Sequence, residues 1–299
     1  MSSPHQPITE DLRRWIVAQA EAGCRPDDVL ASMLASGWNE AVATTALEKT
    51  LLDHLAAKAV ALPSSATALA PTRAHSAAMS VSALPGLAQH GGAARLRAGG
   101  RDVAVLTTLQ LPRVVVFGQL LSDEECTGLM ALAAPRLVRS ETVDNATGGT
   151  EVNPARTSDG MFFERGEAPL ITTIEQRIAE LLHWPVDHGE GLQILRYRPG
   201  AEYRPHHDYF DPVHPGTERI LQRGGQRVAS LVMYLNTPDG GGATTFPDVG
   251  LEVWPVRGNA VFFSYDRPEV STRTLHGGAP VTAGEKWVAT KWLRQGVFT

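Results

Sequence analysis

The stretch Tyr203-Arg-Pro-His-His-Asp-Tyr-Phe210 indicates the fold most directly in this sequence of 299 residues. Residues i and i+2 of a β-strand project from the same side, so His206 and Asp208 can reach one metal ion while His207 points away. His276, which follows Asp208 by 68 residues, must then lie on a strand alongside, as a rolled β-sheet allows. Two imidazoles and one carboxylate are the ligand set of a facial-triad Fe(II) site, which predicts oxygen chemistry.

A second metal-binding arrangement in the same region groups His207 with Asp211 and His214. The spacing of these residues fits neither one face of a strand nor the usual zinc patterns, so the His-x-Asp arrangement is the stronger prediction. His214 is expected on a solvent-exposed loop.

The surrounding sequence is typical of short strands separated by glycine and proline. Strands are expected at about 109–117, 191–198, 203–208, 227–236, 251–254, 259–264, 272–276 and 286–293. Ser122-Asp-Glu-Glu125 is a capping box that begins a helix through about Ala134, and an apolar stripe predicts another helix from Glu167 to about Leu182. The expected fold class is α+β, mainly β: a double-stranded β-helix (jelly roll) with supporting helices.

The chain before residue 107 divides into two segments of different composition. Residues 1–57 carry apolar stripes interrupted at Gly23 and Gly37, which predicts a small N-terminal bundle of three helices. Residues 58–106 are rich in alanine, proline, serine and glycine with little periodicity, which predicts a linker. Residues 107–299 are expected to form the jelly-roll domain.

Composition and charge narrow the class of protein. The chain has 43% hydrophobic and 20% charged residues and a net charge of -5, which gives no electrostatic reason to expect nucleic acid or an anionic membrane as partner. Cys24 and Cys126 are the two cysteines, far apart and without a Cys-x-x-Cys pattern, so neither a zinc ribbon nor a disulfide framework is predicted. With no secretory signal or membrane-spanning stretch in the sequence, a cytoplasmic location is expected.

Several ordered motifs resemble those of a known enzyme family. The motifs are Gln193–Tyr197, Tyr203–Phe210, Met233–Asn236, Gly241–Pro247, Leu275–Pro280 and Gly284–Arg294. In this order they resemble the catalytic domain of prolyl 4-hydroxylases, which are Fe(II)- and 2-oxoglutarate-dependent dioxygenases. The resemblance covers roughly residues 107–299 and leaves out the N-terminal bundle and the linker.

The resemblance implies a metal centre, a cosubstrate site and a reaction. The implied Fe(II) ligands are His206, Asp208 and His276. Lys286 is the implied partner for the distal carboxylate of 2-oxoglutarate, with Tyr197 and Thr244 as further residues of that pocket. The implied reaction couples oxidative decarboxylation of 2-oxoglutarate to succinate and CO2 with hydroxylation of a C–H bond by O2. Ascorbate is implied as the reductant that rescues oxidised iron.

Substrate-contacting residues are also implied by the resemblance. They are Arg156, Ser158, Glu190, Arg227 and Trp292. Arginine and tryptophan suit an extended proline-rich chain, because polyproline II exposes carbonyl groups and ring faces. Arg294 stands where some relatives carry histidine, and Gly-Gly-Ala-Thr244 replaces the more usual Gly-Gly-Glu-Thr; both differences bear on peptide preference.

Period-two alternation in the last predicted strand sorts its side chains between two faces. It places Trp292 and Arg294 on the face of Lys286, toward the site, and Trp287 on the opposite face in the core. Lys291 is expected to be an ordinary surface lysine.

Three hypotheses about function follow from these residues. The first is a dioxygenase that hydroxylates peptidyl proline, with a peptide or protein substrate that can be proline-rich. The second keeps the oxidant but changes the substrate to a free amino acid or another side chain, if the loop of residues 211–226 closes the groove. The third is an inactive barrel that serves as a protein-binding module, with the N-terminal bundle recruiting a partner; the intact triad and Lys286 argue against it.

Overall fold

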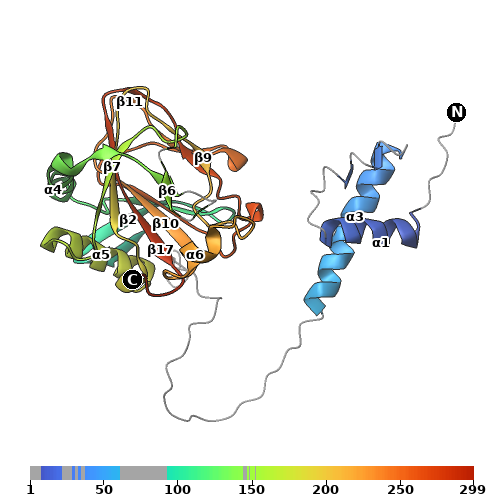
Figure 1. The fold of residues 1–299 in the computed structure, drawn as a ribbon. Helices are drawn as coiled ribbons and strands as arrows, with labels where there is room; N and C mark the ends of the chain where they lie inside the picture. Colours follow the sequence, from blue (N-terminus) through green and yellow to red (C-terminus); the bar gives the residue numbers. More distant parts are fainter. Residues whose placement is uncertain are drawn as a thin grey trace, which may run out of the picture. The chain divides into compact units, whose positions relative to one another are not determined.

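A computed structural model of the chain describes residues 8–21, 29–30, 33–34, 38–60, 93–143, 147, 149–151 and 153–299. The chain separates into two compact units, Met1–Ser76 and Ala77–Thr299, each with its own hydrophobic core (Figure 1). None of the described helices combines the length and the apolar character needed to cross a bilayer.

The N-terminal unit is helical. Helix α1 spans Glu10–Glu21 and packs against α3, which spans Glu40–Val60; residues 29–30 and 33–34 are also helical. Its core contains Ile16, Val29, Met33, Ala43, Ala46 and Leu47. Helix α3 therefore continues past the predicted boundary at residue 57, and the helix ends predicted at Gly23 and Gly37 lie outside the described residues.

A large antiparallel sheet forms the centre of the second unit. Its strands, in spatial order, are β1 Arg95–Ala98, β2 Arg101–Leu109, β3 Arg113–Gly118, β14 Ala260–Ser264, β10 Arg227–Tyr234, β17 Lys286–Arg294, β8 Leu192–Tyr197, β7 Asp159–Phe163 and β4 Val138–Arg139. Strand β17 lies between β10 and β8, so both of its edges are hydrogen-bonded. All of its residues are buried, because both faces of the sheet are covered at this point.

A smaller sheet packs against this one. Its order is β13 Leu251–Val253, β12 Thr244–Phe246, β15 His276–Gly278 and β9 Tyr203–His206. Two short pairs complete the strands: β11 Gly240–Gly241 with β16 Val281–Ala283, and β5 Thr142–Val143 with β6 Thr150–Glu151. An apolar cluster that includes Phe246, Phe263 and Val288 joins residues of both sheets. This arrangement confirms the predicted double-stranded β-helix.

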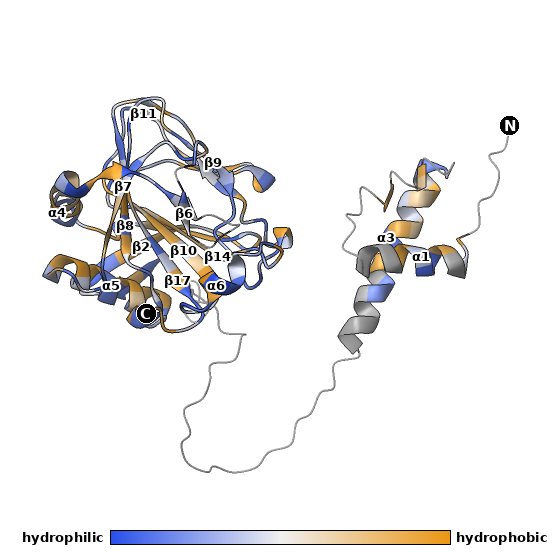
Figure 2. Ribbon diagram, viewed as in Figure 1, coloured by the Kyte–Doolittle hydropathy of each residue, from blue (hydrophilic) through white to orange (hydrophobic). Residues whose placement is uncertain are grey.

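Helices α4 Asp123–Ala133 and α5 Pro169–Leu182 pack on the outer face of the large sheet. The second unit also has a short helix α6 Thr217–Leu221 and the 3-10 turns Ala134–Arg136, Val186–His188, Pro247–Val249 and Val270–Thr272. The predicted capping box is confirmed, because the Glu125 amide donates to Ser122 Oγ (3.1 Å) and the Ser122 amide donates to the Glu125 carboxylate (2.8 Å). Figure 2 shows apolar residues along α5 and along the strands of the large sheet.

Three predicted boundaries are wrong. Residues 95–106 are not linker, because they form β1 and most of β2, in which Leu96, Ala98 and Val103 are buried. The strand predicted at 109–117 is interrupted by a hairpin turn at residues 110–112, where Pro112 has no N–H to donate to a ladder. The strand predicted at 272–276 begins only at His276.

The prediction for Lys291 is also wrong. Its side chain is 2% exposed, and the ammonium donates to Glu175 of α5 (2.5 Å) and to the Glu190 carbonyl. Because β17 is covered on both faces, the lysine is buried and needs an internal counterion. The predicted alternation is confirmed for three residues: Lys286 and Trp292 line one pocket, and Trp287 joins the core on the opposite face. Arg294, predicted toward the site, lines neither cavity and pairs with Glu190 instead.

The buried Lys291–Glu175 pair gives a stability prediction. Lys291→Met leaves Glu175 buried without a counterion and is expected to cost about 3–5 kcal/mol of unfolding free energy in urea unfolding followed by near-UV circular dichroism. Adding Glu175→Met to this variant is expected to restore most of that loss, since no uncompensated charge remains. Arg267→Ala, which removes a solvent-exposed ion pair, is the control, with a cost below about 1 kcal/mol. Equal small costs for Lys291→Met and Arg267→Ala would contradict the account.

Candidate metal centre

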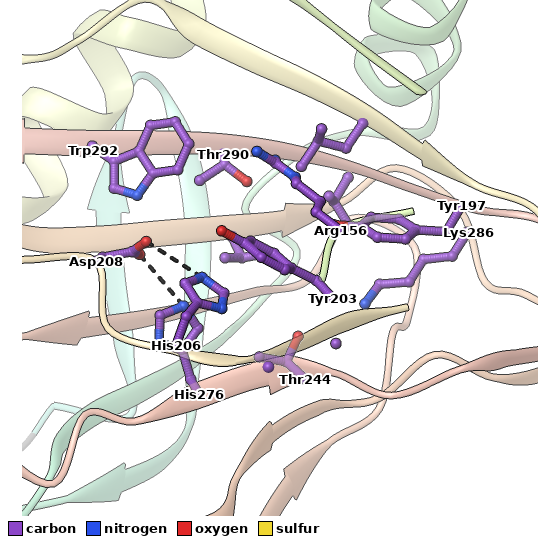
Figure 3. Close-up of a pocket in the computed structure, with 15 residues that line it drawn as sticks. Arg156, Tyr197, Tyr203, His206, Asp208, Thr244, His276, Lys286, Thr290 and Trp292 are labelled. Carbon is purple, nitrogen blue, oxygen red and sulfur yellow. Dashed lines mark ion pairs between the residues drawn. The ribbon is translucent and has the colours of Figure 1, made fainter. Parts of the chain in front are cut away.

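Two strands of the smaller sheet bring three predicted ligands together. His206 ends β9, and the antiparallel register places it opposite His276, the first residue of β15. Asp208 follows two residues after His206, and its carboxylate lies 3.6 Å from His206 Nε2 and 3.4 Å from His276 Nε2 (Figure 3). The ligand atoms of the three residues lie within 4.8 Å of one another, and no other such group was found in the described part of the chain.

Backbone carbonyls fix the orientation of both imidazoles. His206 Nδ1 lies 2.9 Å from the Arg204 carbonyl, and His276 Nδ1 lies 3.0 Å from the Thr274 carbonyl. Since a carbonyl only accepts, each Nδ1 carries the proton and donates it. Each Nε2 is then left with a free lone pair directed at Asp208, which is the tautomer a metal ligand requires.

The charge states of the triad also suit metal binding. Burial alone would raise the pKa of Asp208, but His276, His206 and Arg227 together hold the pKa well below its usual value. Ser230 Oγ donates to the carboxylate at 2.6 Å and fixes one oxygen. Burial lowers the pKa of His276 to about 4, so the imidazole is neutral near pH 7. One anionic oxygen ligand and neutral imidazole nitrogens fit the non-haem Fe(II) donor set.

His207 lies outside this group, as predicted, although the strand predicted at 203–208 ends at His206 and includes neither His207 nor Asp208. Its ring stacks on Tyr209 with the ring centroids 4.6 Å apart. The competing cluster of His207, Asp211 and His214 is not among the close groups of potential ligands in the residues that the structure describes. Instead, the Asp211 carboxylate accepts from the Val213 amide (2.9 Å) within a turn.

Lys286 lies in the same pocket as the triad but on the large sheet. The first residue of β17, it pairs in register with Tyr197 of β8, and its side chain is 4% exposed. The ammonium lies 5.5 Å from the ring centroid of Tyr197 and 5.8 Å from that of Tyr234. Burial lowers its pKa to about 8, and no described carboxylate forms an ion pair with it. A buried cation in this state needs an anionic ligand.

The remaining predicted cosubstrate residues border the same cavity. Tyr197 and Thr244 both line it together with Lys286 (Figure 3). Tyr234 OH donates to Thr244 Oγ1 at 2.8 Å, so the Thr244 hydroxyl hydrogen is free to donate to a ligand. A dicarboxylate with one end at the triad and the other at Lys286 fits this chemistry.

Three of the five predicted substrate residues line the cavity or the adjoining groove. Arg156 and Trp292 line both, and Arg227 lines the groove. Arg227 donates to both carboxylate oxygens of Glu190 (2.7 and 2.9 Å), and its guanidinium lies 4.0 Å from the Trp292 ring centroid. These three residues are therefore positioned to contact a substrate beside the triad.

Ser158 and Glu190 are not at the surface of the cavity or the groove, which corrects the expectation of direct substrate contact. Ser158 is 0% exposed, and its hydroxyl donates to Ser140 Oγ (2.9 Å). The Glu190 carboxylate lies behind Arg227 and is also 2.9 Å from Arg294 Nε. The carboxylate of Glu190 thus orients the side chains of Arg227 and Arg294. Sequence spacing could not reveal this role, because the two arginines lie on strands far from Glu190 in the sequence.

The sequence also left out three residues that shape the site. Tyr203 stacks on His206 with ring centroids 3.7 Å apart, and burial raises its pKa to about 12, so the phenol is neutral. Tyr203 belongs to the same motif as the ligands, and an aromatic residue so close to them was a usable signal. Ser230 and Tyr234 come from β10; Tyr234 lies in the motif Met233–Asn236, whereas no local pattern marks Ser230.

Comparisons with known proteins agree with this site. Residues 192–294 match the model of the 2OG-Fe(II) oxygenase superfamily. The chain is 41% identical over 208 residues to probable prolyl 4-hydroxylase 3 of Arabidopsis thaliana, covering 62% of this chain and 71% of that relative. Prolyl 4-hydroxylase 1 of the same plant is 43% identical over 202 residues, covering 62% and 69%. A viral collagen prolyl hydroxylase from Paramecium bursaria chlorella virus-1 is 29% identical, with 60% and 95% covered and a TM-score of 0.48.

Metal binding is expected to depend on His276 and not on His207. His276→Ala removes one of three ligands and is expected to weaken Co(II) binding by at least about 100-fold, more than the loss of an outer-shell partner costs. His207→Ala, a neighbouring histidine outside the ligand group, is the matched control and is expected to keep near-native affinity. Equilibrium dialysis with Co(II) measures both; equal weakening in the two variants would refute the assignment.

Affinity for 2-oxoglutarate is expected to fall at alkaline pH. Lys286 must carry its proton to attract a carboxylate, and its pKa is about 8, so the ammonium is present below this pH and lost above it. The dissociation constant should be flat below pH 8 and rise about tenfold per pH unit above it. Lys286→Arg, whose guanidinium stays charged, should lose this alkaline rise. A constant affinity from pH 7 to beyond pH 9 in the unmodified protein would contradict the role of Lys286.

Proposed function

The chain belongs to the prolyl 4-hydroxylase family of 2-oxoglutarate- and Fe(II)-dependent oxygenases, and from this membership we propose that its substrate is a prolyl residue of a peptide or protein. It is a 2-oxoglutarate-dependent dioxygenase, whose reaction converts 2-oxoglutarate to succinate and CO2 as the substrate is hydroxylated. The observation that carries the 2-oxoglutarate-dependent activity is the buried ammonium of Lys286, without a carboxylate partner, in one pocket with the His-Asp-His triad.

Each residue of the site has a defined task in this proposal. His206, Asp208 and His276 hold Fe(II) through two Nε2 atoms and one carboxylate, and Fe(II) when bound supplies the redox chemistry with dioxygen. Lys286 holds the distal carboxylate of 2-oxoglutarate, and Thr244 donates a hydroxyl beside it. The apolar walls of the barrel exclude water from the reacting groups.

The groove beside the triad supports an extended substrate. Its lining includes residues of strand β4 and of the segment that follows it, residues of strand β9 and of the segment that follows it, and Val270. Asp211 and His214 also line it. The loop of residues 211–226 therefore contributes a wall of the groove, which favours a peptide over a free amino acid. Arg227 and Trp292 are suited to the carbonyls and ring faces of a polyproline II chain.

Further parts of the proposal rest on resemblance and composition. Ascorbate as the reductant of the iron is supported by the family alone. A cytoplasmic location is supported by the pattern of two widely separated cysteines, of which Cys126 is a free buried thiol. A partner-binding role for the N-terminal unit is supported by its compact helical core.

A variant pair at two tryptophans tests the peptide-binding role. Trp292→Ala is expected to raise the KM for a proline-rich peptide about tenfold, because buried aromatic contacts carry much of such binding, with the KM for 2-oxoglutarate near that of the unmodified protein. Trp254→Ala, at a tryptophan that is 59% exposed and outside the groove, is the control and should change neither constant.

The assay follows succinate and the gain of one oxygen atom by mass spectrometry. The peptide should be hydroxylated only when it contains proline, and a peptide with alanine at every proline should not be modified. Hydroxylation of free proline in preference to every peptide would replace the proposal with the free amino acid alternative.

A further inference from the structure

Arg156 is a buried cation at the junction of the metal pocket and the groove. It forms an isolated bridge with Tyr203, its side chain is 4% exposed, and it lines both cavities. The guanidinium lies 4.8 Å from the Tyr203 ring centroid, and the other neighbour of that ring is His206. Figure 3 shows Arg156 extending over Tyr203 in the direction of Thr290. The guanidinium is therefore one aromatic ring away from a metal ligand.

The partners of Arg156 are neutral. One Nη donates to Gln193 Oε1 (2.8 Å), the other lies 3.4 Å from the Glu141 carbonyl, and the buried Nε has no partner. Other enclosed arginines of the barrel each have a carboxylate: Arg177 pairs with Glu125 at 2.6 Å, Arg227 with Glu190 at 2.7 Å, and Arg294 with Glu190 at 2.9 Å. Within the described residues, Arg156 forms no ion pair with a carboxylate, in contrast to these three.

The same wall offers a second unpartnered donor. Trp292 Nε1 is buried without a hydrogen-bond partner, and Trp292 lines both cavities together with Arg156. The Nε atoms of Arg177 and Arg294 also have no hydrogen-bond partner, but their guanidinium groups already have a carboxylate and they do not line the cavities. The two donors of Arg156 and Trp292 border a cavity, where a ligand can supply the acceptors that buried donors need. A carboxylate suits this position, because its two oxygens match the fork of a guanidinium.

The charge of the site points in the same direction. Among the residues that the structure describes, the site encloses four cations, Lys286, Arg156, Arg227 and Arg294, but only two carboxylates, those of Asp208 and Glu190. Arg227 and Arg294 pair with these carboxylates, and Lys286 and Arg156 do not. Fe(II) carries two positive charges and 2-oxoglutarate carries two negative charges, so their charges cancel when both are bound. Positive charge therefore remains on the substrate side, where low dielectric makes it costly.

We infer that the substrate presents a carboxylate to Arg156, next to the proline that is hydroxylated. This inference rests on the proposed function and names its substrate class more closely: an acidic prolyl substrate. The carboxylate can be the side chain of an aspartate or glutamate, or the α-carboxylate of a proline at the end of a chain. Because one aromatic ring separates Arg156 from His206, the carboxylate lies within about two residues of the reacting proline.

Matched peptides test the inference in the full-length protein with Fe(II) and 2-oxoglutarate. They are blocked at both ends and differ only by glutamate or glutamine at each of the two positions on either side of proline, with a pair ending in proline acid or proline amide. We expect kcat/KM for the best carboxylate peptide to exceed that of its neutral partner about tenfold, since ionic hydrogen bonds are about twice as strong as neutral ones. Fluorescence anisotropy of labelled peptides should give the same ratio in binding without turnover.

Variants assign the preference to Arg156. Arg156→Gln should bring the ratio of carboxylate to neutral peptide close to one, and Arg156→Lys, which keeps the charge, should retain part of it. Arg204→Gln is the matched control, because this groove arginine is exposed and paired with Glu202, and it should keep the preference. If Arg156→Gln does not fold, the comparison of peptides with the unmodified protein still decides the question.

The outcomes separate this inference from the proposed function. A preference for internal glutamate or aspartate identifies an acidic peptide, and a preference for the terminal acid identifies a free α-carboxylate. Equal hydroxylation of carboxylate and neutral peptides overturns the inference and leaves the proposed function standing. Weaker 2-oxoglutarate binding in Arg156→Gln, with an unchanged peptide ratio, also overturns it. Failure to hydroxylate any prolyl compound overturns the proposed function itself.

Discussion

The antiparallel pairing of β9 with β15 is the constraint on which the site depends. It places His276 opposite His206, although 70 residues separate them in the sequence, and the carboxylate of Asp208 follows from this placement. Gly277 permits the close approach of the two strands, because a Cβ there would lie 2.9 Å from the Tyr203 carbonyl oxygen. The glycine after His276 is thus part of how the chain builds its ligand set.

The large sheet contributes the other half of the pocket, and there it buries a lysine without a counterion, which lowers the stability of the fold. Strand β17 carries buried lysines on both faces, but only Lys291 has a carboxylate to balance it. Lys286 is held in the barrel without one, which opposes folding and prepares the pocket for an anion. Unfavourable groups that persist in an otherwise well-packed fold are typical of functional sites, where a ligand restores the balance.

Sequence patterns predicted the features that depend on local spacing. The His-x-Asp spacing with a distant histidine predicted the triad, although β9 ends at His206 and Asp208 lies just beyond it. Ser122 and Glu125 predicted the α4 cap, and period two predicted the faces of Lys286, Trp287 and Trp292 in β17. Contacts between distant segments were not predictable in this way. Lys291 was predicted to be a surface residue, but Glu175 of α5 forms a buried ion pair with it. Glu190 was predicted to contact the substrate, but its carboxylate pairs with Arg227 and Arg294. Strand β1 was missed although Leu96 and Ala98 alternate with arginines, because it has only four residues and directly follows a stretch rich in alanine and glycine.

The central claim is that the triad and Lys286 form one site, in which a single 2-oxoglutarate molecule binds both Fe(II) and the buried ammonium. Anaerobic titration of the protein with Fe(II) and 2-oxoglutarate, followed by visible absorption, tests it most directly. The account predicts a metal-to-ligand charge-transfer band at a stoichiometry of one, absent in Asp208→Ala and needing much more 2-oxoglutarate in Lys286→Met. A band that forms equally well in Lys286→Met, or no band in the unmodified protein, would contradict it.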